Sequence, residues 1–238
     1  MSKVFVIPDI HLKPWILDEA EKLIARCDYD TIVSLGDLVD DWNHQYDLEL
    51  YRDTLAAVAA FADRHPNFLF CYGNHDISYE WARLESGYSV HARWIVLDGL
   101  DRLKASMPED HIAFIHRIDQ VLFSHAGLTK SFVSQYFQGF TGEIDELLEF
   151  INGFGPEELW RDASPIWARP QDGDFEVYPE GFLQVVGHTP VAKTLFLNGF
   201  LTVDNFSTYP NGARIGDGRF IWVDTLSQEW GFADRGGC

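Results

Sequence analysis

Five short polar segments, spread over most of the chain, carry the residue types that bind transition metals. Carboxylate oxygen and imidazole nitrogen together suit Mn, Fe or Zn. The three cysteines are too few and too scattered for a disulfide framework or a thiolate zinc site. Each segment alone is a weak signal, because short patterns of common residues recur by chance, but their order makes the set specific. The segments are Asp9-x-His11, Gly36-Asp37-x-x-Asp40, Gly73-Asn74-His75-Asp76, His125-Ala126-Gly127 and Gly187-His188-Thr189.

The segments follow apolar, often β-branched runs that are typical of buried strands. Between the first three runs, apolar residues recur at helical spacing from Leu17 to Cys27 and from Leu48 to Ala62. A strand–helix alternation of this kind predicts a parallel sheet covered by helices. The first three strands are expected at Val4–Ile7, Thr31–Leu35 and Asn67–Tyr72.

Polar side chains at the ends of these strands are expected to meet. Ligands of open α/β sheets bind at the carboxyl ends of the strands. In Asp9-x-His11, two side chains that are two residues apart can leave a strand end on the same side. The pattern therefore groups Asp9, His11, Asp37, Asn74 and His75 at one edge of the sheet.

The rest of the chain is expected to add strands, one helix and a long loop region. The helix is expected at 144–151, and the region 153–181, rich in Pro, Gly, Trp and Asp, is predicted to shape substrate selectivity. No repeat or linker is visible, which predicts a single domain over residues 1–238. The additional strands are expected at 112–115, 121–124, 182–186, 194–197, 201–203 and 220–223.

Composition and charge exclude several classes of protein. The 238 residues are 46% hydrophobic and 23% charged, which predicts ordinary globular folding. With 37 acidic and 18 basic residues, the net charge of −19 disfavours nucleic acid and anionic membranes as partners. No targeting segment and no apolar stretch long enough to cross a bilayer is visible, so we predict a cytoplasmic protein.

The ordered set of segments resembles the calcineurin-like metallophosphoesterase superfamily, and within it the phosphoprotein-phosphatase branch with its bacterial relatives. The resemblance extends from Val4 to about Asp204. It implies an α/β fold, a four-layer α/β/β/α sandwich, with two divalent metal ions held at the strand ends between two sheets. Manganese is the expected metal, with iron and zinc as alternatives.

The resemblance implies a role for each of six metal-binding side chains. Asp9 and His11 would bind the first metal, Asp37 would bridge both, and the second metal would take Asn74, His125 and His188. Two cations about 3.5–4 Å apart can clamp the attacking and leaving sides of a phosphoester. They also lower the pKa of bound water, which makes hydroxide available near neutral pH.

Two further residues complete the catalytic group that the resemblance implies. His75 would protonate the leaving oxygen as a general acid, which contributes about 10²–10⁴-fold in rate. Asp40 would accept the other ring N–H of His75 and fix its tautomer. Asp76 replaces a glutamate that is commoner in the protein phosphatases, and we give it a supporting role.

One departure from the family pattern concerns the phosphate. The protein phosphatases continue with an Arg where Asp41 follows Asp40, so another cation must hold the phosphate. Arg169 is our candidate, because the run 166–170 looks like the Leu-Trp-x-Arg segment of bacterial members, and Arg161 is the second candidate. Asp204 also resembles a family position and is expected to be structural.

A second departure concerns the ending of the metal site. Gly187-His188-Thr189 lacks the second His of the Gly-His-x-His ending found in many nucleases and cyclic-nucleotide phosphodiesterases of the superfamily. This favours the phosphatase and dinucleotide-polyphosphatase side of the superfamily. It also leaves the first metal short of one imidazole, a place that water can fill.

The predicted function is hydrolysis of a phosphate monoester by a metal-bridging hydroxide. The substrate is expected to be phosphoserine or phosphothreonine in a protein, or a small phosphorylated metabolite. The first alternative is a dinucleoside polyphosphate hydrolase, with Trp160 and Trp167 stacking on bases. A nuclease ranks third, because the acidic charge disfavours it. An alternative of another class is a catalytically inactive scaffold that binds proteins, which the missing Arg suggests.

Overall fold

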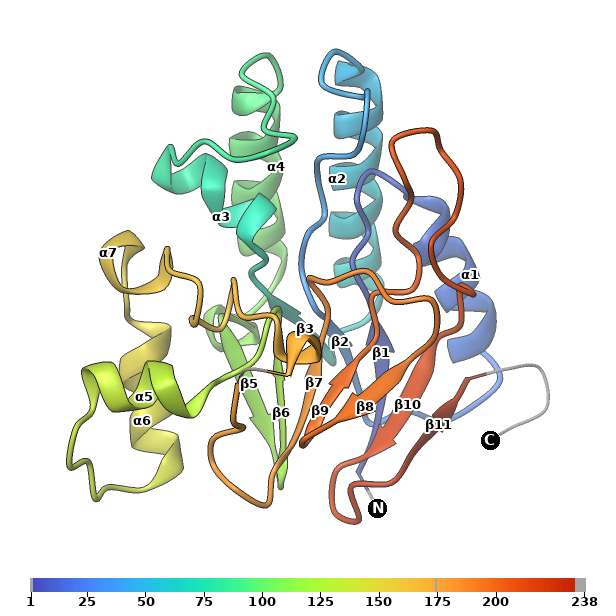
Figure 1. Ribbon diagram of the computed structural model, residues 1–238. Coiled ribbons are helices and arrows are strands. Elements are labelled where there is room, and N and C mark those ends of the chain that lie inside the picture. The colour runs from blue at the N-terminus through green and yellow to red at the C-terminus, as the bar shows by residue number, and fades with distance from the viewer. Residues whose placement is uncertain (1, 174, 234–238) are drawn as a thin grey trace.

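Two β-sheets lie face to face in the computed structural model, which describes residues 2–173 and 175–233 (Figure 1). The first sheet contains, in spatial order, β11 (Trp230–Phe232), β10 (Ile221–Asp224), β1 (Lys3–Ile7), β2 (Thr31–Ser34), β3 (Phe68–Cys71) and β4 (Ile112–Ala113). The second contains β5 (Ile115–Ile118), β6 (Val121–Ser124), β7 (Leu183–Val186), β9 (Phe200–Thr202) and β8 (Leu195–Leu197).

The predicted parallel core of the first sheet is confirmed. β1 pairs in parallel with β2, and β2 pairs in parallel with β3. Side chains alternate across β1, because Val4 and Val6 pack between the two sheets while Phe5 and Ile7 pack against the helices. Three helices cover that outer face: α1 (Trp15–Ile24), α2 (Leu48–Arg64) and α4 (Arg93–Ser106) (Figure 1).

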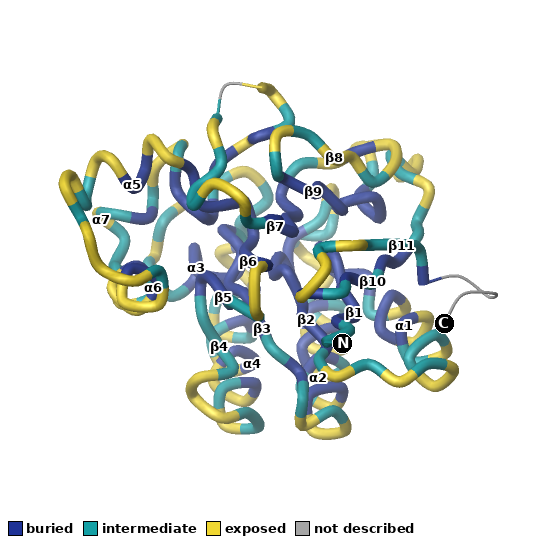
Figure 2. The backbone as a smooth tube through the Cα atoms, turned by 90° about the horizontal axis from the view of Figure 1, so that it is seen from below, coloured by how far each residue is buried: buried dark blue, intermediate teal, exposed yellow. Residues whose placement is uncertain are grey.

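The mixed α/β architecture with two central sheets is likewise confirmed. The outer side of the second sheet carries shorter elements, with α6 (Ile144–Asn152) against β5 and the 3₁₀ helix η2 (Pro170–Asp172) against β8 and β9. Near α6 lie α5 (Lys130–Tyr136) and α7 (Pro156–Leu159) (Figure 1). The buried residues concentrate along the strands between the outer layers (Figure 2).

One predicted strand is wrong, because the structure divides it between the two sheets. The run 112–115 is not a single strand: β4 belongs to the first sheet and β5 to the second, so the chain crosses between sheets at Phe114. The side chain of Asn152 holds this crossing, because its Oδ1 accepts from the backbone N–H groups of Phe114 and Ile115 at 3.0 and 2.9 Å. An apolar run cannot reveal such a change of sheet.

Other elements were not predicted from the pattern of residues. The residue pattern does not predict α3 (Asn74–Trp81), α4, α5 or β11, whereas the helix predicted at 144–151 is confirmed as α6. None of the helices in the described part of the chain has the length and hydrophobicity that crossing a membrane requires. The single-domain organisation stays a prediction.

A buried histidine links the two sheets and should make stability depend on pH. His116 of β5 contacts the carbonyl oxygen of Phe70 in β3 at 3.0 Å, and burial lowers the pKa of His116 to about 4. The unfolded chain therefore binds a proton that the folded protein excludes, so stability is present above the unfolded pKa and falls as pH decreases. As pH falls from about 7 to about 5, we expect His116 to lower the free energy of unfolding by about 2 kcal/mol.

The substitution His116→Gln isolates this contribution, because its amide can still donate to the Phe70 carbonyl but does not titrate. Urea unfolding at the two pH values should show a smaller loss in the variant than in the wild type. The same loss in both proteins would mean that His116 is not the group responsible.

Candidate metal centre

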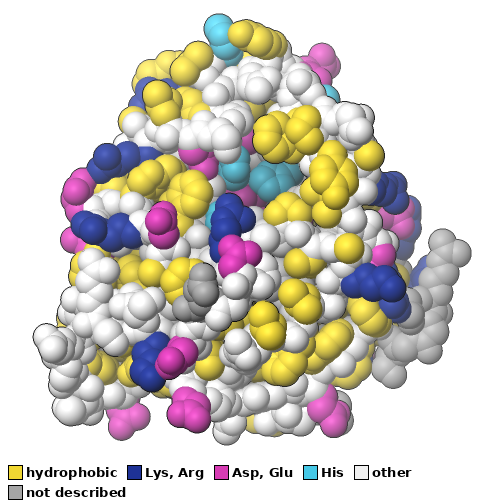
Figure 3. Space-filling view, viewed as in Figure 1, with side chains coloured by type: hydrophobic (Ala, Val, Ile, Leu, Met, Phe, Trp, Pro, Cys, Tyr) yellow, Lys and Arg dark blue, Asp and Glu magenta, His cyan; other side chains and the backbone are white. Residues whose placement is uncertain are grey.

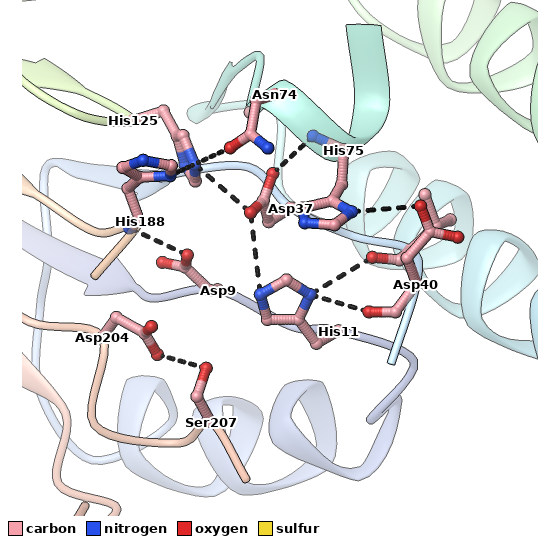
Figure 4. Close-up of polar contacts among 12 residues, drawn as sticks. Asp9, His11, Asp37, Asp40, Asn74, His75, His125, His188, Asp204 and Ser207 are labelled. Carbon is pink, nitrogen blue, oxygen red and sulfur yellow. Dashed lines mark hydrogen bonds and ion pairs between the residues drawn. The ribbon is translucent and has the colours of Figure 1, made fainter. Parts of the chain in front are cut away.

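The loops that follow β1, β2, β3, β6 and β7 converge at one edge of the two sheets (Figure 4). Four of the predicted site residues have a left-handed backbone: His11, Asp37, Asp40 and His188, with φ between 43° and 64°. This conformation costs a non-glycine residue about 1–3 kcal/mol and persists where surrounding contacts impose it. The strain therefore concentrates where the predicted site lies.

Asp76 ties two of these loops together from behind. Its carboxylate accepts three backbone N–H groups, those of Asp37 at 2.8 Å, Leu38 at 2.9 Å and Gly73 at 3.0 Å. The loops approach so closely that a Cβ on Gly36 would lie 2.3 Å from the backbone nitrogen of Gly73. The structure thus places Asp76 where a supporting residue is needed, with no contact to the cleft.

Asp37 lies at the centre of the site. Its Oδ2 is 3.2 Å from His125 Nε2 and 3.6 Å from His11 Nε2, while its Oδ1 accepts the backbone N–H of His75 at 3.0 Å (Figure 4). Two groups of residues bring ligand atoms within 4.8 Å of one another, and Asp37 belongs to both: His11, Asp37 and His75, and Asp37, His125 and His188. One carboxylate shared by two adjacent ligand groups is the arrangement that a bridging ligand requires.

The surroundings of His125 fit a cation. Its Nδ1 lies 2.8 Å from the carbonyl oxygen of Leu35, to which it can donate, so in the neutral ring Nε2 carries a lone pair. That lone pair faces the Oδ1 of Asn74 at 2.9 Å and Nδ1 of His188 at 3.1 Å, as well as Asp37. Several electron-pair donors pointing at one another are stabilised by a metal ion among them.

Buried atoms without a partner mark the other side of the site. Oδ1 of Asp9, Oδ2 of Asp204 and Nε2 of His188 have no hydrogen-bond partner within the described residues. Oδ2 of Asp9 accepts the backbone N–H of His188 at 2.9 Å. Burial, and next the charge of Asp204, raise the pKa of Asp9 well above its usual value. Buried carboxylates with an unpartnered oxygen are stabilised in their charged form by a bound cation, so the residues present fit a divalent metal ion.

Asp204 also holds in place the segment of the chain that follows it. Its Oδ1 accepts the hydroxyl of Ser207 at 2.7 Å, at the start of the excursion that runs over residues 205–219 between β9 and β10. This contact accords with the structural role expected for Asp204. His11 is oriented in a similar way, since its Nδ1 lies 2.8 Å from the carbonyl oxygen of Asp40 and leaves Nε2 facing Asp37.

His75 and Asp40 are in contact, as the resemblance implied. Nδ1 of His75 lies 3.1 Å from Oδ2 of Asp40, whose other oxygen accepts the hydroxyls of Tyr51 at 2.5 Å and Tyr79 at 2.6 Å. Burial disfavours the imidazolium, but the neighbouring carboxylates, Asp37 foremost, raise the pKa of His75 to about 10. The ring lines the cleft, and in the metal-free protein these carboxylates favour the protonated form that a general acid needs.

One buried carboxylate at this site was not predicted from the residue pattern. The side chain of Glu85, between α3 and α4, is 5% exposed; its Oε2 accepts the amide of Asn74 at 2.5 Å and its Oε1 is 3.5 Å from Nδ1 of His75. Burial raises the pKa of Glu85 to about 7. Because the Asn74 amide donates to Glu85, the Asn74 oxygen must face His125, the orientation that a metal ligand needs. No motif surrounds Glu85, so only its place in space reveals it.

The substitution Glu85→Ala is therefore expected to weaken metal binding by about 10–100-fold, the usual cost of removing a group that orients a ligand. Glu85→Gln keeps an oxygen that accepts from Asn74 and should retain most of the affinity. Titration calorimetry with Mn²⁺ on the metal-free proteins measures both. Equal losses in the two variants would show that charge, and not the orientation of Asn74, is what Glu85 provides.

Of the two arginine candidates, only Arg169 reaches the cleft. Its guanidinium donates to the hydroxyl of Thr189 at 2.8 Å, and it is the one Arg or Lys among the described residues that line the cleft. Arg161 is not at the cleft: its Nε donates to the carbonyl oxygen of Glu157 at 2.8 Å on the surface. Arg161 as phosphate ligand is thus wrong, because the turn after α7 directs it elsewhere.

The two tryptophans of the same region also differ in position relative to the cleft. Trp167 lines the cleft, with its ring 5.5 Å from that of His188. Trp160 does not line the cleft, because its ring packs between Trp167 and Trp81. A base-stacking pair formed by these two residues is therefore wrong. Trp42 and Tyr209, which the sequence reasoning missed, line the cleft instead.

Comparison with known sequences identifies one family. A sequence model of the calcineurin-like phosphoesterases matches residues 2–216. No curated protein matches the chain.

The solved structures that match the chain are distant in sequence. A protein serine/threonine phosphatase from Saccharomyces cerevisiae is 16% identical, with a TM-score of 0.54 over 93% of this chain and 72% of that chain. A metallophosphoesterase from Sphaerobacter thermophilus is 17% identical, with a TM-score of 0.43 over 97% of this chain and 87% of that chain. At these identities the first likeness shows the fold alone.

Proposed function

Because the chain belongs to the calcineurin-like phosphoesterase family, we propose that it is a dinuclear metal-dependent phosphatase that hydrolyses phosphate monoesters. The observation that carries this proposal is Asp37, shared by two adjacent groups of ligand atoms, with His75 and Asp40 beside it in one cleft. Asp9, His11, Asn74, His125 and His188 would complete the two shells, with manganese as the expected metal.

The bound cations would supply Lewis acidity and an activated water near neutral pH. The chain's own residues do the rest. Arg169 would hold the phosphate oxygens at the mouth of the cleft. As water attacks phosphorus and the bond to the leaving oxygen breaks, His75 gives its proton to that oxygen, and Asp40 keeps the ring in place. No covalent phosphoenzyme is needed.

The substrate that we propose is a phosphoserine or phosphothreonine of a protein, or a small phosphorylated metabolite. A dinucleoside polyphosphate is the second candidate, and the aromatic side chains Trp42, Trp167 and Tyr209 in the cleft favour it. The net charge of −19 argues against nucleic acid and anionic membranes as partners. The cytoplasmic location belongs to the same proposal.

A non-catalytic binding scaffold is less well supported. The left-handed backbone in the loops around Asp37 and His75 costs stability, and a binding scaffold without catalysis gains nothing from it. Arg169 also supplies the cation whose absence next to Asp40 suggested lost catalysis.

The test is hydrolysis of p-nitrophenyl phosphate by the metal-free protein before and after addition of Mn²⁺. We expect activity that appears with the metal, disappears with a chelator and shows a KM raised by about tenfold in Arg169→Ala. The proposed function would be refuted if the protein showed metal-dependent hydrolysis of neither this ester nor a phosphopeptide. Cleavage of diadenosine tetraphosphate in preference to both would favour the second candidate.

A further inference from the structure

One end of the cleft is lined by exposed aromatic side chains. Trp42, from the loop between β2 and α2, is 48% exposed, and Tyr209, from the 205–219 excursion, is 53% exposed. Both line the same cleft as His75 and Arg169, with Pro210 beside them. Figure 3 shows histidine side chains at the bottom of this hollow and hydrophobic side chains around it. Large rings at a cleft, where water surrounds them, are available to contact a ligand.

Two hydrogen bonds tie the loops that carry these rings. The amide of Asn43 donates to the carbonyl oxygen of Pro210 at 2.9 Å, and the hydroxyl of Thr208 donates to Oδ1 of Asp41 at 3.3 Å. Asp41 is fixed in turn by the buried Lys13, whose Nζ lies 2.7 Å from its Oδ2. The two loops that carry these rings are therefore tied to each other, which preorganises the aromatic end of the cleft. Preorganised rings suit a small flat ligand, because little conformational freedom is lost when it binds.

The charges in the cleft indicate which part of a ligand lies at this end. Arg169, the cation available to a phosphate, donates to the hydroxyl of Thr189, which follows the metal-site residue His188. In the loop that carries Trp42, the charge of Asp41 is balanced by Lys13. An anionic group gains nothing there, whereas a flat uncharged ring can stack on indole or phenol.

We propose that Trp42 and Tyr209 form a subsite for a nucleobase, so that the substrate is a nucleotide whose phosphate lies at the metal centre. This inference rests on the proposed function and narrows its small-metabolite class. Stacking of one base on aromatic side chains changes affinity by about tenfold or more.

The experiment compares two esters that share the same ribose phosphate: adenosine 5′-monophosphate and ribose 5-phosphate. The Mn²⁺-loaded full chain should show a kcat/KM that is higher for the nucleotide by about tenfold or more. Trp42→Ala and Tyr209→Ala should each lower the ratio of the two kcat/KM values toward one. The matched control is Trp94→Ala, which removes an exposed tryptophan of α4 outside the cleft and should keep the wild-type ratio.

Binding of adenosine, measured by calorimetry, separates the subsite from the chemistry. Weaker binding in Trp42→Ala would support the subsite even if neither ester were hydrolysed, and the proposed function alone would then fail. The same ratio and the same adenosine affinity in wild type, Trp42→Ala and Tyr209→Ala would overturn the subsite, whatever the activity. Trp42-dependent hydrolysis of a phosphopeptide without nucleotide discrimination would also overturn it, in favour of a peptide.

Discussion

Replacing His75 with Asn should lower the turnover of an alkyl phosphate by about 10²–10⁴-fold, because the amide can still donate to Asp40 but has no proton to give to the leaving oxygen. The loss should be smaller for p-nitrophenyl phosphate, whose leaving group needs little protonation. Mn²⁺ binding, measured by calorimetry on the metal-free protein, should be retained. Steady-state kinetics on the two esters, with saturating Mn²⁺, checks the expected difference.

This comparison also decides between two readings of the geometry. His75 contributes an atom to one of the two candidate ligand groups, together with His11 and Asp37. If His75 were a ligand, the variant would lose metal affinity and would lose turnover on both esters alike. Unchanged kinetics on the alkyl phosphate would remove the general-acid assignment altogether.

Short-range patterns in the sequence identified the parts of this site that lie next to a strand. Asp9, Asp37 and Asn74 follow buried apolar runs, and parallel pairing of β1, β2 and β3 brings their carboxyl ends to one edge. The order of strands therefore determines which polar residues meet. The contacts of Asp40 with His75 and of Asp76 with the Asp37 loop follow from the same convergence.

Residues placed by long loops could not be found in the same way. Glu85 contacts Asn74 only because the chain turns back after α3, and no local pattern records that turn. Tyr209 reaches the cleft on an excursion between β9 and β10 that is tied to the Asn43 loop, 167 residues away in sequence. Arg161 and Arg169 have similar sequence surroundings, but Arg161 donates to the nearby carbonyl oxygen of Glu157, whereas Arg169 donates to Thr189 in another loop. The tertiary contact of Arg169 is not encoded locally, so the pattern could not tell which arginine reaches the cleft.

Asp37→Asn should have the largest effect on metal binding. A neutral amide cannot balance two cations, and it offers one oxygen where the carboxylate offers two, so we expect at most one bound Mn²⁺ and an affinity reduced by more than about 100-fold. Turnover should fall to the background rate. Calorimetry gives the affinity and stoichiometry, and elemental analysis of the Mn²⁺-loaded protein gives an independent count.

The same substitution has a consequence that needs no metal. Burial lowers the pKa of His125, but Asp37 reverses this and raises it to about 9. Without that carboxylate the pKa of His125 must fall in the metal-free protein, and that of His75 with it, which NMR titration of the ring protons can follow. Asp47→Asn, a surface change that keeps a side chain able to cap α2, is the control and should alter neither pKa. Two retained Mn²⁺ ions and unshifted histidines in Asp37→Asn would mean that Asp37 does not join two metal positions.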